Sequence, residues 1–144
     1  MKLTIVYDNE IYKDNPGTSD HGFSCYIQTD EQNILFDTGT DGKTLLENMK
    51  LLDIDPSTIE TVVISHEHYD HNGGLTQLLP SLKNPIIYRL EPATTDSNVV
   101  EKKVDEPIEI APHIISTGRL PGSPEDEQSL LLKTKKGLVK QNKY

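Results

Sequence analysis

The residues with the clearest chemistry are three histidines and an aspartate within the segment HEHYDH, residues 66–71. Side chains two residues apart point the same way in an extended chain, so His66 and His68 can reach one metal ion together. Asp70 and His71 follow as the backbone turns, and they can face a second ion nearby. Imidazole and carboxylate groups suit zinc, iron or manganese. The segment therefore predicts a site for one or two divalent ions, with zinc expected first and iron or manganese as alternatives.

The chemistry expected of such a site is hydrolysis. A bound divalent ion lowers the pKa of water to about 7, and two ions about 3.5–4 Å apart can clamp a substrate oxygen. We predict that Asp70 and His71 are catalytic as well as metal ligands. The alternative is a histidine-rich surface loop with no function. It is disfavoured because the segment follows a buried type of strand and precedes Gly73-Gly74, and active-site residues commonly occupy such strand-end loops.

The elements that must position these residues alternate between short apolar runs and polar turns. One amphipathic helix is expected over residues 42–52, with Thr40 or Asp41 as its cap, and a second short helical turn over 75–79. Residues 89–127 contain five prolines and are expected to be mostly loop. Strands are expected at residues 3–7, 23–29, 33–36, 61–64, 86–88 and 113–117, and a hairpin at 128–140.

Several other residues with reactive side chains are more simply explained by structure. Cys25 alternates with two apolar residues, so a core position is a better interpretation than a metal ligand. Glu67 alternates away from the neighbouring histidines, which predicts a solvent position or a supporting role for it. Tyr69 is expected to pack or support the site, and His113 is expected at the surface.

Composition limits the classes of protein and partner. The 144 residues suffice for one domain, predicted to span 1–144, and 14 Lys plus Arg against 23 Asp plus Glu give a formal net charge of -9. Such an acidic surface disfavours nucleic acid, but it permits a small-molecule substrate, phosphorylated or not, held by a metal. No apolar run is long enough for a membrane span, and no secretory leader is evident. With a single cysteine, we expect a cytoplasmic protein.

The motif ISHEHYDHNGG resembles the HxHxDH signature of the metallo-β-lactamase superfamily. The segments DHGFSCYI, NILFDTG, LLENMKLLDID and ISTGRL…EDEQSLLLKTKKGLV resemble, in this order, one subgroup. Its members are metal-dependent hydrolases similar to the methanopterin-pathway ribofuranosylaminobenzene phosphate synthases. The resemblance implies an α/β (α+β) fold, an αββα sandwich with a mixed, largely antiparallel sheet, and a metal-dependent hydrolase acting on a phosphoester or related ester.

The resemblance also implies roles for particular residues. His66 and His68 would serve one ion, and Asp70 and His71 the other. Asp37, in FDTG, matches a position that supports the site without binding the metal. His21, in DHGFS, resembles a position near the mouth of the active site.

The sequence departs from this family on the C-terminal side of the HEHYDH segment. The resemblance implies a third histidine for the first ion in a GCSHPG-like segment after KTKKGLV, then a bridging aspartate and a last histidine, and none occurs in the 144 residues. A catalytic zinc usually has three protein ligands. We therefore expect only the N-terminal half of the sandwich, a truncated domain. The alternative to an active hydrolase is an inactive remnant or half-domain that binds metal weakly and needs a second copy, as a homodimer, or a complementing chain.

Overall fold

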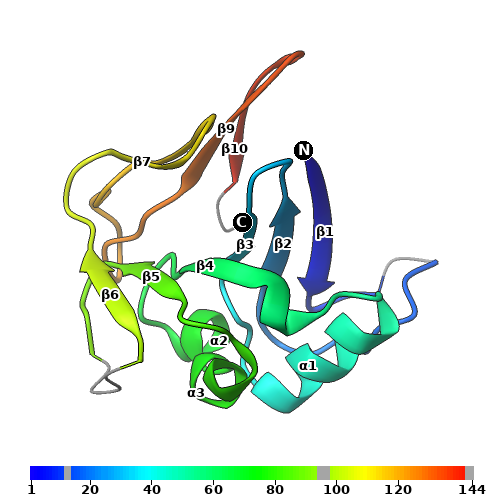
Figure 1. The fold of residues 1–144 in the computed structure, drawn as a ribbon. Coiled ribbons are helices and arrows are strands. Elements are labelled where there is room, and N and C mark those ends of the chain that lie inside the picture. The colour runs from blue at the N-terminus through cyan, green and yellow to red at the C-terminus, as the bar shows by residue number, and fades with distance from the viewer. Residues whose placement is uncertain (12–13, 94–97, 142–144) are drawn as a thin grey trace.

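The computed structural model describes residues 1–11, 14–93 and 98–141, which leaves residues 12–13, 94–97 and 142–144 outside the described part of the chain. Two β-sheets and a group of helices make up this part (Figure 1). The first sheet contains β1 (Lys2–Tyr7), β2 (Ser24–Gln28), β3 (Asn33–Phe36), β4 (Ile59–Val63), β5 (Ile86–Arg89) and β6 (Val100–Lys103). The second contains β7 (Ile108–Ala111), β8 (Ile114–Ser116), β9 (Leu130–Thr134) and β10 (Gly137–Gln141). The helices are α1 (Gly42–Leu51), α2 (Tyr69–Asn72) and α3 (Leu75–Leu78), with 3₁₀ turns η1 (Pro56–Thr58) and η2 (Leu79–Ser81).

The first sheet is mixed, as predicted. Strands β1 to β3 pair antiparallel, with a long loop between β1 and β2 and a short turn between β2 and β3, and β3 to β6 pair parallel in the order β3-β4-β5-β6. Parallel neighbours need crossover connections, which are usually helical. The chain passes through α1 between β3 and β4, and through α2 and α3 between β4 and β5. The second sheet is antiparallel, in the order β10-β9-β8-β7.

The layers result from the alternation of side chains along the central strands. Leu35 and Val62 point to a core shared with the helices, whereas Ile34 and Phe36 point to a second core shared with the four-stranded sheet. The described helices all lie on one side of the six-stranded sheet (Figure 1). The chain is therefore an α–β–β arrangement, which corresponds to three layers of the predicted αββα sandwich.

Helix α1 begins where the sequence indicated. The Asp41 side chain accepts a hydrogen bond from Thr44 N at 2.8 Å, and this bond holds the pKa of the Asp41 carboxyl below its usual value. Leu45 and Met49 form the buried face of the helix. Asn48 is also buried and donates to the carbonyl oxygens of Val6 and Thr18, so α1 is tied to β1 and to the loop before β2.

The predictions for residues 89–127 were partly wrong. Strand β8 lies inside the predicted 113–117, but the sequence reasoning missed β6 and β7. Both strands are four residues long and largely exposed, and β6 has three charged residues in VEKK. Short edge strands of this kind lack the apolar alternation that reveals a strand in sequence. The 128–140 hairpin is confirmed as β9 and β10.

None of the described helices is long and apolar enough to span a membrane.

Candidate metal centre

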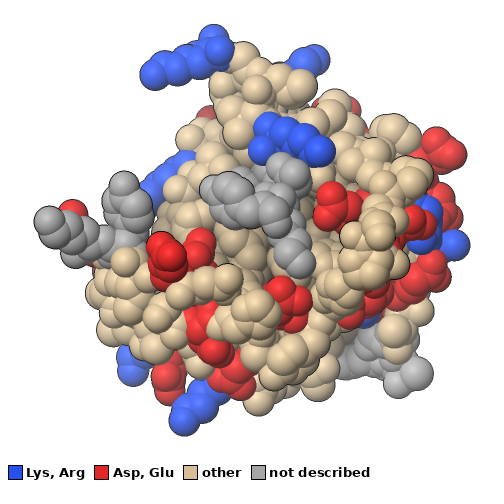
Figure 2. All heavy atoms as spheres, turned by 180° about the vertical axis from the view of Figure 1, so that it is seen from behind, with Lys and Arg blue, Asp and Glu red and all other residues tan. Residues whose placement is uncertain are grey.

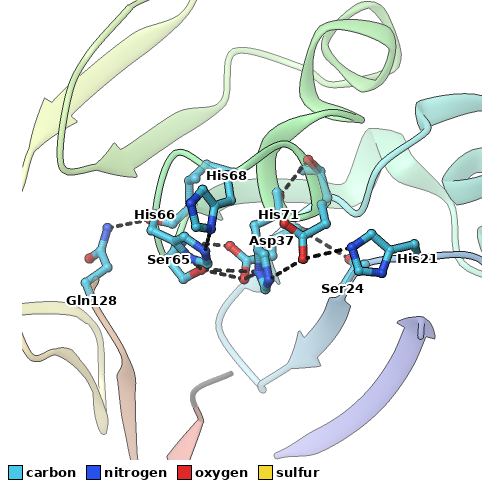
Figure 3. A network of polar contacts seen from close by, with 12 residues as sticks. His21, Ser24, Asp37, Ser65, His66, His68, His71 and Gln128 are labelled. Carbon is cyan, nitrogen blue, oxygen red and sulfur yellow. Dashed lines mark hydrogen bonds and ion pairs between the residues drawn. The ribbon is translucent and has the colours of Figure 1, made fainter. Parts of the chain in front are cut away.

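The candidate metal centre lies at the edge of the six-stranded sheet where β3 and β4 end. The two strands are parallel neighbours, with Phe36 opposite Val63, so the residues after them emerge side by side. Asp37 comes directly after β3, and Ser65 and His66 come shortly after β4. In open α/β sheets, ligands bind outside the carboxyl ends of the strands, which is where these side chains gather (Figure 3).

Asp37 is the buried polar centre of this cluster. Its side chain accepts hydrogen bonds from Ser65 N at 2.6 Å, from Ser65 Oγ at 2.7 Å and from His71 Nδ1 at 2.6 Å. Asp37 has a positive φ of 60°, in the left-handed region that aspartate tolerates better than most residues. Burial raises the pKa of the Asp37 carboxyl, and the hydrogen bonds from His71 and Ser65 oppose this shift.

The hydrogen-bond network assigns the tautomers of the two buried imidazoles. His71 Nδ1–H donates to Asp37, which leaves His71 Nε2 as a lone-pair donor. Ser65 Oγ–H donates to Asp37, so Ser65 Oγ accepts from His66 Nδ1–H at 2.8 Å. His66 Nε2 then also carries a lone pair. Metal-binding histidines have this arrangement, with one nitrogen on the metal and the other on a supporting partner.

The four chemically active residues of the HEHYDH segment lie close together. His66 Nε2 lies 3.1 Å from His68 Nδ1, and the ring centroids of His66 and His71 are 4.3 Å apart. His71 Nε2 lies 3.3 Å from Asp70 Oδ2. Within the described residues, two groups have ligand atoms within 4.8 Å of one another, namely His66-Asp70-His71 and His66-His68-Glu125. His66 belongs to both, so the division of the four ligands between two ions stays a prediction.

His21 lies at the open side of the cluster. Its Nε2 is 3.6 Å from Asp70 Oδ2, with the His21 side chain 71% exposed and that of Asp70 17% exposed. Phe23 N donates to the Asp70 carbonyl, and a Cβ on Gly22 would meet the same carbonyl oxygen at 2.4 Å. The close approach of Gly22 therefore brings the segment before β2, and His21 with it, against the metal-binding segment.

Three other residues considered from sequence take structural positions. Cys25 is buried in the core between the sheets, where desolvation raises the pKa of its thiol to about 12. His113 is exposed at the turn between β7 and β8. Glu67 points away from the histidines and pairs with Arg89 of β5, which confirms the predicted supporting position. Tyr69, expected to pack or to support the site, is instead 66% exposed.

The sequence reasoning missed three residues of the site. Ser65 links Asp37 to His66. Gln128 is buried and donates to the Ile64 carbonyl oxygen at 2.8 Å, which joins the second sheet to the end of β4 (Figure 3). Glu125 Oε1 lies 2.8 Å from His68 Nε2. Ser65 adjoins the motif, but nothing local in the sequence distinguishes Gln128 or Glu125 from other polar residues near prolines.

The residues present fit a divalent cation. The donors are imidazole nitrogens and carboxylate oxygens, which suit zinc, iron and manganese. Glu125 Oε1 is buried and has no hydrogen-bond partner among the described residues. A buried carboxylate is costly unless it is paired with a cation, and a bound metal ion beside the imidazoles would supply that pairing.

The chain combines an α–β–β arrangement with histidines and carboxylates gathered at a strand end. These two features define a class of two-sheet proteins that bind divalent metal at the sheet edge. The family model described as the metallo-beta-lactamase superfamily matches residues 17–133. The chain therefore belongs to the metallo-beta-lactamase superfamily, and this membership implies divalent metal binding.

Individual relatives and solved structures resemble the chain in sequence or in fold. The chain is 29% identical, over 90% of its length, to the 7,8-dihydropterin-6-methyl-4-(beta-D-ribofuranosyl)-aminobenzene-5'-phosphate synthase of Methanocaldococcus jannaschii, and covers 53% of it. The metallo-beta-lactamase fold protein YhfI from Bacillus subtilis matches with a TM-score of 0.68 and 17% identity, over 96% of this chain and 60% of that one. A quorum-quenching N-acyl homoserine lactone lactonase matches with a TM-score of 0.62 and 22% identity, over 82% and 58%. The chain thus spans about half to three-fifths of these three proteins.

Proposed function

We propose that this chain is a metal-dependent hydrolase in which a metal-activated water attacks a phosphoester or related ester of a small molecule. The observation that carries the proposal is the convergence of His66, His68, Asp70 and His71, with the Nδ1 atoms of two buried histidines held by supporting partners. A divalent ion, when bound there, supplies Lewis acidity and lowers the pKa of water to about 7. Hydrolases among the relatives support this class of reaction, since one of the solved structures is a lactonase.

The residues around the ion would divide metal binding and proton transfer among them. His66 and His71 would bind the ion through Nε2, while Ser65 and Asp37 hold their rings in place. Asp70 borders the open side, where its Oδ2 can accept a proton during the reaction. His21 Nε2 lies 3.6 Å from that oxygen and is largely exposed, so it offers the proton a path to solvent.

A hollow beside the centre supports a small substrate. It has a volume of about 360 Å³ and is lined by residues that include Glu67, Arg119 and Glu125. A larger hollow of about 460 Å³ lies at β1 and the loop before β2, with Ile5, Tyr7 and Asn48 in its wall. The smaller hollow includes Glu125, whose Oε1 lies 2.8 Å from His68 Nε2, whereas no residue lining the larger one belongs to the centre, so we assign substrate binding to the smaller hollow.

The test combines metal analysis with turnover. The purified chain would be stripped of metal, loaded with zinc, manganese or iron, and assayed with bis(p-nitrophenyl) phosphate and with a simple lactone. We expect bound metal, metal-dependent turnover, and loss of both in His66→Ala. His113→Asn is the matched control, because asparagine tolerates the positive φ of 70° at that exposed position.

Two results would contradict the proposal. A protein that binds none of the metals and stays inert after loading would remove the metal centre itself. Metal binding without turnover of any ester would instead favour the alternative of a binding module or a half-domain that needs a second copy or another chain.

A further inference from the structure

The loop that connects β8 to β9 carries a carboxylate into the candidate metal centre. Leu120 and Glu127 exchange backbone hydrogen bonds of 2.8 and 3.0 Å, which closes the loop at its base. The loop is tight, because a Cβ on Gly122 would meet the Glu125 carbonyl oxygen at 2.1 Å. The neighbouring carboxylate, Asp126, pairs with Arg119 at 3.3 Å. The backbone therefore fixes Glu125 over the histidines.

The position of Glu125 Oε1 is that of a ligand atom. It lies 2.8 Å from His68 Nε2 and 3.8 Å from His66 Nε2. It is buried and makes no hydrogen bond within the described residues, and its 2.8 Å contact with His68 is an ion pair only when the imidazole is protonated. Ligand atoms of the two histidines and of Glu125 all lie within 4.8 Å of one another, close enough to share one cation.

We propose that Glu125 supplies the third protein ligand to the ion held by His66 and His68. The proposal rests on the metal centre of the proposed function and names a ligand of it that lies outside the HEHYDH segment. Two histidines and a glutamate form a donor set that catalytic zinc sites use, with the fourth position open to water or substrate. The first ion would thus have three protein ligands within the described chain.

The experiment measures metal binding directly, without enzyme activity. The metal-free protein would be titrated with Co²⁺ in the presence of a chromogenic chelator, and the visible absorption of bound Co²⁺ recorded, for the wild type, Glu125→Gln and Asp126→Asn. Asp126→Asn is the matched control, since it removes one carboxylate from the same loop. Far-UV circular dichroism and thermal unfolding of the metal-free proteins would verify that each variant folds.

We expect Glu125→Gln to weaken Co²⁺ binding about 100-fold or more, beyond the 10- to 100-fold loss typical of supporting residues. Its Co²⁺ absorption bands should also shift and change in intensity, because the ligand set changes, while Asp126→Asn keeps the wild-type affinity and spectrum. Wild-type affinity in Glu125→Gln would overturn the proposal. Weaker binding with an unchanged spectrum would also overturn it and make Glu125 a positioning residue for His68. A wild type that binds no metal would refute the proposed function instead.

Discussion

At the scale of residues, each buried histidine of the centre has its second nitrogen held by a partner. Asp37 holds His71 directly, and it holds His66 through Ser65. One carboxylate therefore fixes the orientation of two imidazoles and keeps their Nε2 atoms facing the same side. Replacement of such a supporting partner typically costs 10- to 100-fold in metal affinity.

Replacement of Asp37 by asparagine tests this arrangement. The amide has one oxygen where the carboxylate has two, so it cannot accept from Ser65 N, Ser65 Oγ and His71 Nδ1 together. We expect Asp37→Asn to weaken metal binding by about 10- to 100-fold, measured by competition with a chromogenic chelator. Asp30→Asn, in the exposed turn between β2 and β3, is the control. Equal affinities for Asp37→Asn and wild type would show that the carboxylate does not orient the histidines.

The sequence was sufficient to predict the ligands within the HEHYDH segment, but not the residues that approach them from distant parts of the chain. His66, His68, Asp70 and His71 are close in sequence, so their types and spacing were sufficient to bring them together. Glu125 lies more than 50 residues further along, and it approaches His68 only because the second sheet packs on the first. Long-range contacts of this kind leave no periodic signal in a single sequence.

At the scale of elements, the metal-binding segment is anchored to the neighbouring strand β5. Glu67 lies between two histidines and pairs with Arg89, which also binds Glu101 at 3.0 Å. The Arg89 side chain is 8% exposed. Because Glu67 is held on the β5 side, His66 and His68 are directed to the opposite side of the segment.

Replacement of Arg89 by glutamine should therefore destabilise the fold. Breaking a buried pair leaves an uncompensated charge and costs roughly 3–5 kcal/mol, and we expect about 3 here because Glu67 keeps some contact with water. Urea unfolding measures the loss. Lys43→Gln is the control, since its pair with Glu47 is exposed and should contribute little. Unchanged unfolding in Arg89→Gln would mean that solvent replaces the arginine without cost.

Gly74 determines how closely the metal-binding segment approaches the end of β3. A Cβ at Gly74 would meet the Thr38 carbonyl oxygen at 2.3 Å, although its φ of -75° suits any residue. We expect Gly74→Ala to destabilise the protein by about 1–3 kcal/mol through overpacking, measured by urea unfolding. Thr76→Ala, on the exposed side of α3, should change stability little. A Gly74→Ala protein as stable as Thr76→Ala would show that the backbone yields at this contact.

The elements were predictable wherever their side chains alternate between a core and solvent or between two cores. Strand β3 was predicted to the residue, and α1 was predicted to within one residue at its end. The parallel order β3-β4-β5-β6 was not evident, because single strands do not reveal their neighbours. The helical turn α2 was missed because YDHN has no apolar periodicity.

At the scale of the whole molecule, the charge of the surface bears on its partners. Figure 2 shows Asp and Glu side chains gathered over the lower and right-hand parts of one face, with Lys and Arg side chains dispersed. With a formal net charge of -9, such a surface repels phosphate backbones. We therefore expect no nucleic-acid binding at physiological salt, and a filter-binding assay with duplex and single-stranded DNA checks this. Affinity in the micromolar range or tighter would contradict it.

Within the part of the chain that the structure describes, the second sheet ends in an edge with no further strand, which suggests association with another chain. Strand β10 is the last strand of that sheet, and Leu138 and Val139 are 62% and 44% exposed on it. Unpaired edges with apolar side chains are sites where chains pair. The same hairpin carries Lys133, Lys135, Lys136 and Lys140, so two copies meeting there would repel each other.

The exposed apolar side chains favour a homodimer at β10 and the lysines oppose it, and together they predict how the dimer depends on salt. Because salt screens the repulsion between lysines but leaves apolar burial intact, self-association should strengthen as ionic strength rises from about 0.01 to about 1 M. Sedimentation velocity over a range of concentrations measures it. Leu138→Glu should weaken the dimer by removing apolar surface, whereas Leu51→Glu, at the exposed end of α1, should not. A protein that stays monomeric at high concentration and high salt would exclude self-pairing at this edge.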